Sequence, residues 1–478
     1  MTVPKDKALD ALAARLHGPL LEPGDAGYEP ARRIWNAMID RRPAASARCS
    51  GAADVEDCVD FARETGMSLS VRGGGHNIAG TSLADGGLVV DLSGLRGVHV
   101  DPATRRVRVQ PGATLADLDR ETQAHGLVVP SGIVSETGVA GLTLAGGFGW
   151  LSRKWGYTCD HLISADVVTA AGEHVRASAD DNDDLFWGLK GGSGNFGVVT
   201  SFEFAARVLG PEVTAGIIVH PFAAAREVIG LYRELAASAS DELSLLLVLR
   251  KAPPAPYLPQ AVHGQPIAAL ALCHAGERAA AEREVAPIKA FGSPHADTVG
   301  SKPFRAHQKL LDAGQPKGRH YYWKSDYVAD LPPDLDDVLI GAAEALTSPH
   351  SAILVMQLGG AARRVGEDES AVGLREAGHV VNFSGSWEGG SPEAHVAWAR
   401  EAFDALQPFS MGGGYLNFLT EDDLAGDGLR VRRAYGAQQH ARLGRLKARW
   451  DPDNLFRNNH NIAPAERSAR APRRATSP

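Results

Sequence analysis

The segment from Val71 to Asn77, VRGGGHN, holds residues whose types and spacing are suited to chemistry. Three glycines at residues 73–75 follow a strand-like run at residues 68–72 and come directly before His76. Because glycine has no Cβ and tolerates positive φ, consecutive backbone N–H groups here can converge on an anion such as a pyrophosphate. The pattern predicts a phosphate-binding turn, whereas His76 taken alone is equally well explained as a polar turn residue.

Two further glycine clusters lie at residues 132–149 and 188–197. The first follows the strand-like residues 126–130, and the second comes before the strand-like residues 198–204. Dense glycine beside strands indicates backbone that packs closely against a flat or phosphorylated group. The elements that must position His76 are therefore short strands joined by glycine loops, and the first half of the chain is interpreted as a cofactor cradle.

Other catalytic motifs are poorly supported. Residues 192–197 match GxGxxG, but a helical run at residues 185–190 precedes them and a strand follows, the reverse of the Rossmann order. The acidic run at residues 180–184 lacks the glycine and terminal glutamate of a calcium loop and is better explained as a helix cap. The chain has no HExxH, GxSxG or paired Cys/His spacing, so neither a metal site nor zinc or serine hydrolase chemistry is predicted.

Composition narrows the class of protein. The 478 residues carry 49 Lys and Arg against 57 Asp and Glu, a net charge of −8, which does not favour nucleic acid or an anionic membrane as a partner. The sequence shows neither a signal-peptide pattern nor an apolar run of about 18 residues. Four cysteines without a paired spacing favour a reducing compartment. We expect a cytoplasmic protein that binds no membrane.

The pattern of elements changes along the chain. From about residue 211, helix-like runs (223–238, 277–291, 391–406) alternate with strand-like runs (242–250, 266–276, 351–360, 379–387), which is typical of an antiparallel sheet covered by helices. We therefore expect an α+β fold with a first part at residues 1–208, an inserted part at 209–411 and a returning segment at 412–466. Residues 467–478 are expected to be a disordered tail.

Taken together, the ordered motifs resemble those of the berberine-bridge-enzyme-like family of FAD oxidoreductases, which have the vanillyl-alcohol oxidase type of FAD-binding fold. The resemblance rests on residues 71–77, 130–160, 184–204, 321–327, 415–418 and 449–464, and it extends over about residues 28 to 464. It implies two domains, in which both ends of the chain bind FAD and a substrate domain is inserted between them.

The resemblance also implies the cofactor contacts. In this family the histidine of the RGGGHN motif is bonded to the flavin 8α-methyl carbon, which points to His76. Many relatives add a second bond from a cysteine, but Val134 stands at that position, so we expect one covalent bond. The positions expected to bind FAD are Arg72, Gly73, Gly74, Gly75, His76, Asn77, Ser82, Ser131, Thr137, Gly138, Gly141, Gly147, Val199, Asn417 and Asn459.

The catalytic base is uncertain from the sequence. Many relatives have a tyrosine directly after the asparagine of their YxN motif, whereas this chain has Phe418 after Asn417. Tyr415 is one candidate base, and a strand over residues 415–418 would place it with Asn417 on the face opposite Phe418. Lys324 is another candidate, because a desolvated lysine can titrate near neutral pH. Other residues that could line a pocket are Tyr321, Tyr322, Trp323, Gln357 and Asn382.

Three functions fit these features. The favoured one is an FAD oxidase that takes a hydride from an alcohol or amine carbon of a small, secondary-metabolite-like molecule and is reoxidised by O₂. The resemblance implies that Thr137 lies beside the flavin and controls access of O₂. Because its hydroxyl could hold O₂ there, an oxygenating or rearranging enzyme is the second possible function. A dehydrogenase with another acceptor, or a flavin-binding protein without activity, are the remaining alternatives. The sequence does not indicate the oligomeric state.

Overall fold

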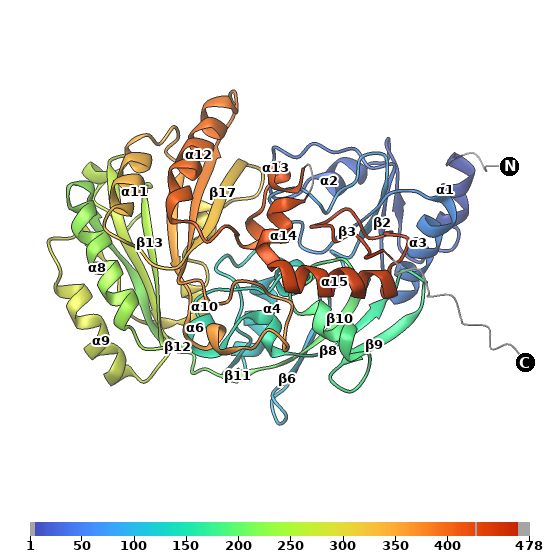
Figure 1. Cartoon of the computed structure of the whole chain (residues 1–478), viewed down its shortest axis with the longest axis horizontal. Coiled ribbons are helices and arrows are strands. Elements are labelled where there is room, and N and C mark those ends of the chain that lie inside the picture. The colour runs from blue at the N-terminus through green and yellow to red at the C-terminus, as the bar shows by residue number, and fades with distance from the viewer. Residues whose placement is uncertain (1–4, 426–427, 467–478) are drawn as a thin grey trace, which may run out of the picture.

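The computed structural model describes residues 5–425 and 428–466. Four sheets are present in these residues, and an eight-stranded sheet lies apart from three smaller ones (Figure 1). The predicted tail at residues 467–478 lies outside the described residues. None of the described helices is long and apolar enough to cross a membrane.

A four-stranded sheet carries the first glycine loop. Its strands are β1 (Leu20–Leu21), β2 (Ala45–Arg48), β4 (Leu88–Asp91) and β3 (Leu69–Arg72), in that spatial order. Strands β2, β4 and β3 run parallel, and helix α3 (Ala52–Thr65) packs its apolar face against them. Because β3 ends at Arg72, the glycines follow at the carboxyl edge of a buried parallel sheet, where ligands commonly bind.

A five-stranded antiparallel sheet carries the second and third glycine clusters. Its order is β5 (Val98–Asp101), β6 (Arg106–Val109), β10 (Val198–Ala205), β8 (Leu162–Val168) and β9 (His174–Ser178). Helices α4 (Leu115–Gln123), α5 (Val139–Leu144) and α7 (Asp183–Leu189) share an apolar core with it. A small sheet of β7 (Leu127–Val128) and β11 (Arg207–Val208) and the short helices α1 (Lys5–Ala13), α2 (Tyr28–Arg32) and α6 (Ser152–Trp155) complete this half.

The inserted part is built on the eight-stranded antiparallel sheet. Its strands are β15 (Ala296–Asp297), β12 (Glu212–Pro221), β14 (Pro266–His274), β13 (Leu243–Lys251), β18 (Ala352–Gln357), β19 (His379–Trp387) and β17 (His320–Val328), with β16 (Gly300–Pro303) paired to β12. Helices α8 (Ala225–Ser238), α9 (Arg278–Ala290), α11 (Leu335–Glu344) and α12 (Glu393–Leu406) cover what we call the outer face (Figure 1). The inner face is turned toward the glycine loops and α10 (Phe304–His307).

The C-terminal segment returns to the first half of the chain. Helices α13 (Glu421–Leu424), α14 (Leu429–Tyr435) and α15 (Ala437–Trp450) lie beside the smaller sheets in Figure 1. Leu443 and Leu446 of α15 and Ile462 pack into the core of the five-stranded sheet. The α+β fold with helices on one face of an antiparallel sheet is thus confirmed, and the division at residues 208 and 411 stays a prediction that this packing supports.

Hydrogen bonds from two polar side chains connect the inserted part to the half of the chain that the sequence predicts to bind FAD. Arg153 of α6 donates hydrogen bonds to the carbonyl oxygens of Leu243 at 2.8 Å and Leu358 at 2.7 Å. Asn36 donates to the carbonyls of Ile78 and Tyr321, both at 3.0 Å. Because buried carbonyls otherwise lack partners, these bonds hold the inner face of the sheet at a set distance from the glycine loops.

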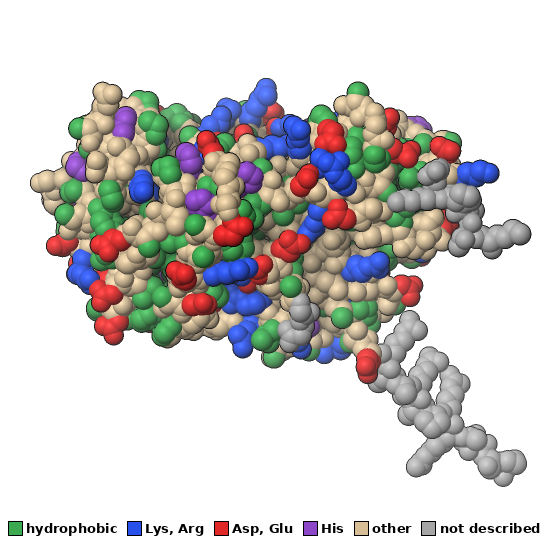
Figure 2. Space-filling model, turned by 90° about the horizontal axis from the view of Figure 1, so that it is seen from above, with side chains coloured by type: hydrophobic (Ala, Val, Ile, Leu, Met, Phe, Trp, Pro, Cys, Tyr) green, Lys and Arg blue, Asp and Glu red, His purple; other side chains and the backbone are tan. Residues whose placement is uncertain are grey.

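On the face of the molecule drawn in Figure 2, acidic and basic side chains are interspersed, and neither positive nor negative charge covers a continuous area. This distribution agrees with the small net charge of −8.

Candidate cofactor and active site

A long cavity lies between the glycine loops and the inner face of the eight-stranded sheet. The glycine loops supply Gly73 to Asn77, Gly132 to Val134 and Thr137 to Leu142. The sheet supplies Trp323 of β17, Leu354 and Met356 of β18, and Asn382 of β19. The predicted site residues in the lining are Gly73, Gly74, Gly75, His76, Asn77, Ser82, Thr137, Gly138, Gly141, Val199, Tyr415, Asn417 and Asn459.

Two of the glycine loops touch at Gly74 and Gly138. A Cβ on Gly74 would lie 2.6 Å from the Cα of Gly138, and a Cβ on Gly138 would lie 2.6 Å from the nitrogen of Gly74. Gly75 has φ of +65°, which favours glycine. No other residue type permits this contact, so the floor of the cavity is formed by backbone, as the glycine clusters predict.

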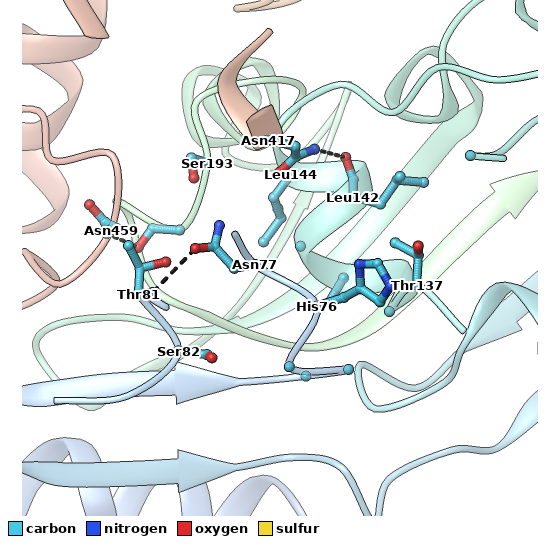
Figure 3. A pocket seen from close by; sticks show the side chains of 18 of the residues that line it. His76, Asn77, Thr81, Ser82, Thr137, Leu142, Leu144, Ser193, Asn417 and Asn459 are labelled. Atoms are coloured by element: carbon cyan, nitrogen blue, oxygen red, sulfur yellow. Dashed lines mark hydrogen bonds between the residues drawn. The ribbon is translucent and has the colours of Figure 1, made fainter. Parts of the chain in front are cut away.

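His76 lies at one end of this floor, close to Thr137 (Figure 3). Its Nε2 atom is buried and has no hydrogen-bond partner. Burial lowers the pKa of His76 to about 4, so the imidazole is neutral at physiological pH. A neutral imidazole with an unpartnered nitrogen in a cavity is chemically suited to form a bond to an electrophilic carbon.

Polar side chains gather at the other end, where Thr81, Ser82 and Asn459 lie (Figure 3). The Oγ of Ser82 and the Oδ1 of Asn459 are buried and unpartnered. Asn459 is held by its Nδ2, which donates to the carbonyl of Gly194 at 2.8 Å. Unpartnered buried polar atoms beside glycine backbone suit an elongated ligand with phosphate and hydroxyl groups, so the residues present fit FAD.

Three predicted cofactor residues lie outside the cavity lining. Arg72 is buried behind the loop, where its guanidinium donates to the carbonyls of Ala31 and Arg33. Ser131 is buried beside the cavity but does not line it. The N–H of Gly147 donates to the hydroxyl of Tyr415 at 3.2 Å. Arg72 and Gly147 are thus corrected from direct contacts to supports of residues that do line the cavity.

Lys324 does not line the cavity, so the structure gives no support to its prediction as a catalytic base. Successive side chains of a strand point to opposite faces, and Trp323 takes the inner face of β17. The ammonium of Lys324 instead donates to Asp423 of α13 at 2.8 Å, in a buried pair away from the cavity lining. Tyr322 shares the outer face with it, packed in the core under the helices.

Residues 415–418 do not form the expected strand. Leu416–Phe418 is a 3₁₀ turn, and Tyr415, Asn417 and Phe418 all line the cavity. Side chains in a 3₁₀ turn do not alternate between two faces as they do in a strand, so Phe418 lines the same cavity as Tyr415 and Asn417. Its ring lies 5.1 Å from that of Trp323, which makes an aromatic corner of the cavity.

The hydroxyl of Tyr415 is held as an acceptor. Asn417 Nδ2 donates to it at 2.8 Å, and the N–H of Gly147 donates at 3.2 Å. These two bonds occupy both lone pairs, so the remaining capacity of the hydroxyl is to donate its own proton. Burial raises the pKa of Tyr415 to about 12, although both donors lower it. Tyr415 is therefore protonated at neutral pH.

The inner face contributes few of the polar residues that the sequence indicated. Asn382 lines the cavity, whereas Gln357 points to the outer face, where its Nε2 donates to the carbonyl of Ala236. Sequence reasoning missed Gln315 and His460 in the lining. His460 belongs to the motif at residues 449–464 and could have been singled out there, but no local signal marks Gln315.

Thr137 and Val134 both line the cavity, and Thr137 lies beside His76 (Figure 3). The hydroxyl of Thr137 makes no hydrogen bond to another described residue, and its carbonyl accepts from the N–H of Leu115 at 2.9 Å. The four cysteines are buried, and none belongs to the described lining. Burial raises the pKa of Cys159 well above its usual value, which keeps that thiol protonated.

Two family models match the chain. One, described as an FAD binding domain, matches residues 43–178, and the other, described as berberine and berberine like, matches residues 414–463. The first match includes His76 and the cradle at residues 130–149, and the second includes Tyr415, Asn417 and Asn459.

Similar proteins extend over nearly the whole chain. (R)-6-hydroxynicotine oxidase of Paenarthrobacter nicotinovorans is 28% identical and covers 94% of this chain and 97% of its own. Xylooligosaccharide oxidase of Thermothelomyces thermophilus is 28% identical over 97% of this chain and 95% of its own. The crystal structure of 6-hydroxy-D-nicotine oxidase from Arthrobacter nicotinovorans superposes with a TM-score of 0.83 at 26% identity, covering 94% of this chain and 98% of that one.

Proposed function

Because the chain belongs to the berberine-bridge-enzyme-like family of FAD-linked oxidoreductases, we propose that it is an oxidase acting on an alcohol or amine carbon of a small molecule. Bound FAD supplies an acceptor for a hydride from the substrate and a donor of two electrons to O₂, which leaves as H₂O₂. The observation that carries this proposal is the single cavity that joins the glycine floor to Trp323 and Asn382 of the sheet.

The FAD is attached through His76 alone. The unpartnered Nε2 and the neutral state of this imidazole support the attachment. Val134 in the lining and the burial of the cysteines support a single bond. The backbone of residues 73–75, together with Ser82 and Asn459, would hold the polar parts of the cofactor.

Tyr415 acts as a hydrogen-bond donor in the cavity. Its oxygen already accepts from Asn417 and Gly147, and its high pKa keeps its proton in place. A donor at this position polarises a polar atom of the substrate or cofactor and does not remove a proton. A neutral amine that gives up a hydride becomes an iminium ion, so an amine substrate needs no protein base. The hydroxyl proton of an alcohol substrate would pass to water.

Reoxidation by O₂ is the second half of the proposed cycle. Thr137 is small enough to leave room beside the cavity floor, which supports access of O₂. Its hydroxyl, without a partner among the described residues, favours a second candidate function, an oxygenating enzyme that holds O₂ there. The secondary-metabolite substrate and the cytoplasmic location stay predictions.

Anaerobic mixing of the holoenzyme with a panel of alcohols, amines and polyphenols tests the proposal. A true substrate bleaches the flavin absorption, and readmitted air restores it with release of one H₂O₂ per turnover. If no compound bleaches the flavin, the proposed oxidase is wrong. Oxygen incorporation into the product from labelled O₂ would identify the oxygenating alternative.

A further inference from the structure

The carboxamide of Asn382 is buried in the inner face of the sheet without a hydrogen-bond partner. The residue is 1% exposed, and both its Oδ1 and its Nδ2 are unpartnered. It lines the cavity. A buried polar group that makes no hydrogen bond destabilises a fold, so such a group in a cavity wall points to a ligand.

The surroundings of Asn382 are apolar. Leu354 stands directly opposite it on β18, and Met356 and Trp323 are on the same face, each two residues from the position that pairs with Asn382 on its strand. Ser325 stands opposite on β17, and its hydroxyl is also unpartnered, yet it does not line the cavity and does not bond to Asn382. The amide is thus the polar point of an otherwise hydrophobic wall.

The whole cavity is neutral. Its described lining contains no Asp, Glu, Lys or Arg. Its titratable groups are His76, His460 and Tyr415, and their pKa values of about 4, about 4 and about 12 leave them uncharged near pH 7. The backbone N–H groups of the glycine loops can bind the phosphates of FAD. A charged substrate group beside Leu354 and Met356 would instead lose its hydration without gaining a counter-ion, which is strongly unfavourable.

We propose that Asn382 selects the substrate: a neutral, largely apolar aromatic or heteroaromatic molecule that presents a donor and an acceptor side by side, as a carboxamide or lactam does. The Nδ2 of Asn382 donates a hydrogen bond to the acceptor of such a group, and the Oδ1 of Asn382 accepts one from its donor. Trp323 and Phe418 contact the apolar body. The inference rests on the proposed function, because it names the substrate class of the same cavity.

Chemistry favours this class over two others. A sugar carries many hydroxyl groups, and the wall around Asn382 offers Leu354, Met356 and Trp323 in place of partners for them. A carboxylate or ammonium lacks a counter-charge. A ligand with only an acceptor would satisfy the Nδ2 of Asn382 and leave its Oδ1 unpaired.

Binding of unreactive probes to the holoenzyme, followed by the change in flavin absorption, tests the inference without turnover. The probes are benzamide, methyl benzoate, benzoate and xylobiose. We expect benzamide to bind about tenfold more tightly than methyl benzoate, since one amide atom stays unpaired with the ester. Benzoate and xylobiose should bind more weakly still. In N382L the preference for benzamide over methyl benzoate should fall below about twofold.

Two matched variants separate Asn382 from other amides. Q357L makes the same change on the outer face and should keep the preference. Q315L alters another carboxamide of the lining and should also keep the preference. Loss of the preference in Q315L but not in N382L would overturn the proposal, as would equal binding of benzamide and methyl benzoate by the unmutated protein, or tight binding of benzoate or xylobiose.

Stability provides an independent readout. Replacing an unpartnered buried amide by an apolar side chain of similar size should leave the melting temperature of N382L unchanged or higher, and a marked decrease would contradict the unpartnered state. If N382L perturbs the flavin environment, N382V serves in its place. Selective binding without bleaching by any substrate would refute the oxidase and leave this inference standing, whereas bleaching with no dependence on Asn382 would refute the inference alone.

Discussion

The indole ring of Trp35 stacks on the imidazole of His76, with ring centroids 4.4 Å apart and planes inclined by 21°. The same indole also stacks on the ring of Tyr321 in the eight-stranded sheet, with ring centroids 3.8 Å apart and planes inclined by 11°. The indole Nε1 donates to the carbonyl of Gln315 at 2.9 Å, which prevents rotation. The orientation of His76 is therefore set by aromatic rings from two distant parts of the chain.

Loss of this stack should slow covalent attachment. In W35L the imidazole gains freedom, and the rate of FAD incorporation into apoprotein should fall roughly 3- to 10-fold, the value of an aromatic stack. In H76A no FAD should stay with acid-precipitated protein, although FAD should still bind reversibly. Intact-mass measurement after acid precipitation distinguishes the cases. An FAD mass increment on H76A would disprove attachment at this residue.

A single attachment is expected because the cavity lining has Val134 and no cysteine among its described residues. Proteolysis of the holoenzyme and mass spectrometry of the yellow peptides should find one flavin peptide, which contains His76. The V134C variant should gain a second linkage if this side chain reaches the flavin ring. A cysteinyl-flavin peptide from the unmutated protein would contradict the prediction.

The rate of flavin reduction should be independent of pH over a wide range. Burial lowers the pKa of His460 to about 4, which keeps that residue neutral above this pH, and raises the pKa of Tyr415 to about 12, which keeps its proton in place below that pH. With a substrate that does not itself titrate, anaerobic stopped-flow should therefore give a flat profile from about pH 6 to 10. A rise with pH that disappears in Y415F would show that Tyr415 is a base after all.

Substitutions at three positions should separate catalysis from stability. Y415F removes the proposed donor and should slow flavin reduction roughly 10²-fold, while F418Y should be tolerated. K324M should leave that rate unchanged, because its ammonium pairs with Asp423 away from the cavity. It should instead lower the free energy of unfolding by about 1 to 3 kcal/mol, since Asp423 loses a buried partner. A slowed reductive step in K324M with unchanged stability would reverse this interpretation.

Access of O₂ should depend on Thr137. T137L fills space at the His76 end of the cavity and should slow reoxidation of reduced enzyme at least roughly tenfold in stopped-flow mixing with O₂. T137V conserves the shape and removes the hydroxyl, so it should keep simple oxidase turnover and abolish any oxygen insertion. Slow reoxidation of the unmutated enzyme would instead indicate a dehydrogenase with another acceptor.

Several features could be predicted from the sequence because they depend on local backbone geometry. Gly73 to Gly75 specify a turn without side chains, whereas the Gly74 contact with Gly138 is a tertiary contact that the absence of Cβ at both positions permits. The strands β18 and β19 and helix α12 were expected within a few residues of their bounds, since periodicity of apolar residues is a property of neighbours in the chain. The α+β fold and the floor of the cavity were thus determined by the sequence itself.

Tertiary structure decided the rest. The alternation of side chains along a strand predicts that Trp323 and Lys324 face opposite sides of the sheet, but it does not predict which of them faces the cavity. The packing of α12 on β17 and the ion pair of Lys324 with Asp423 decide this orientation. Residues 416–418 form a 3₁₀ turn, although their sequence suggested a strand. The stack of His76, Trp35 and Tyr321 joins residues that are 41 and 286 positions apart in the chain, and the amide of Asn382 has no hydrogen-bond partner. No local pattern encodes them, because burial and hydrogen-bond satisfaction are properties of the packed chain.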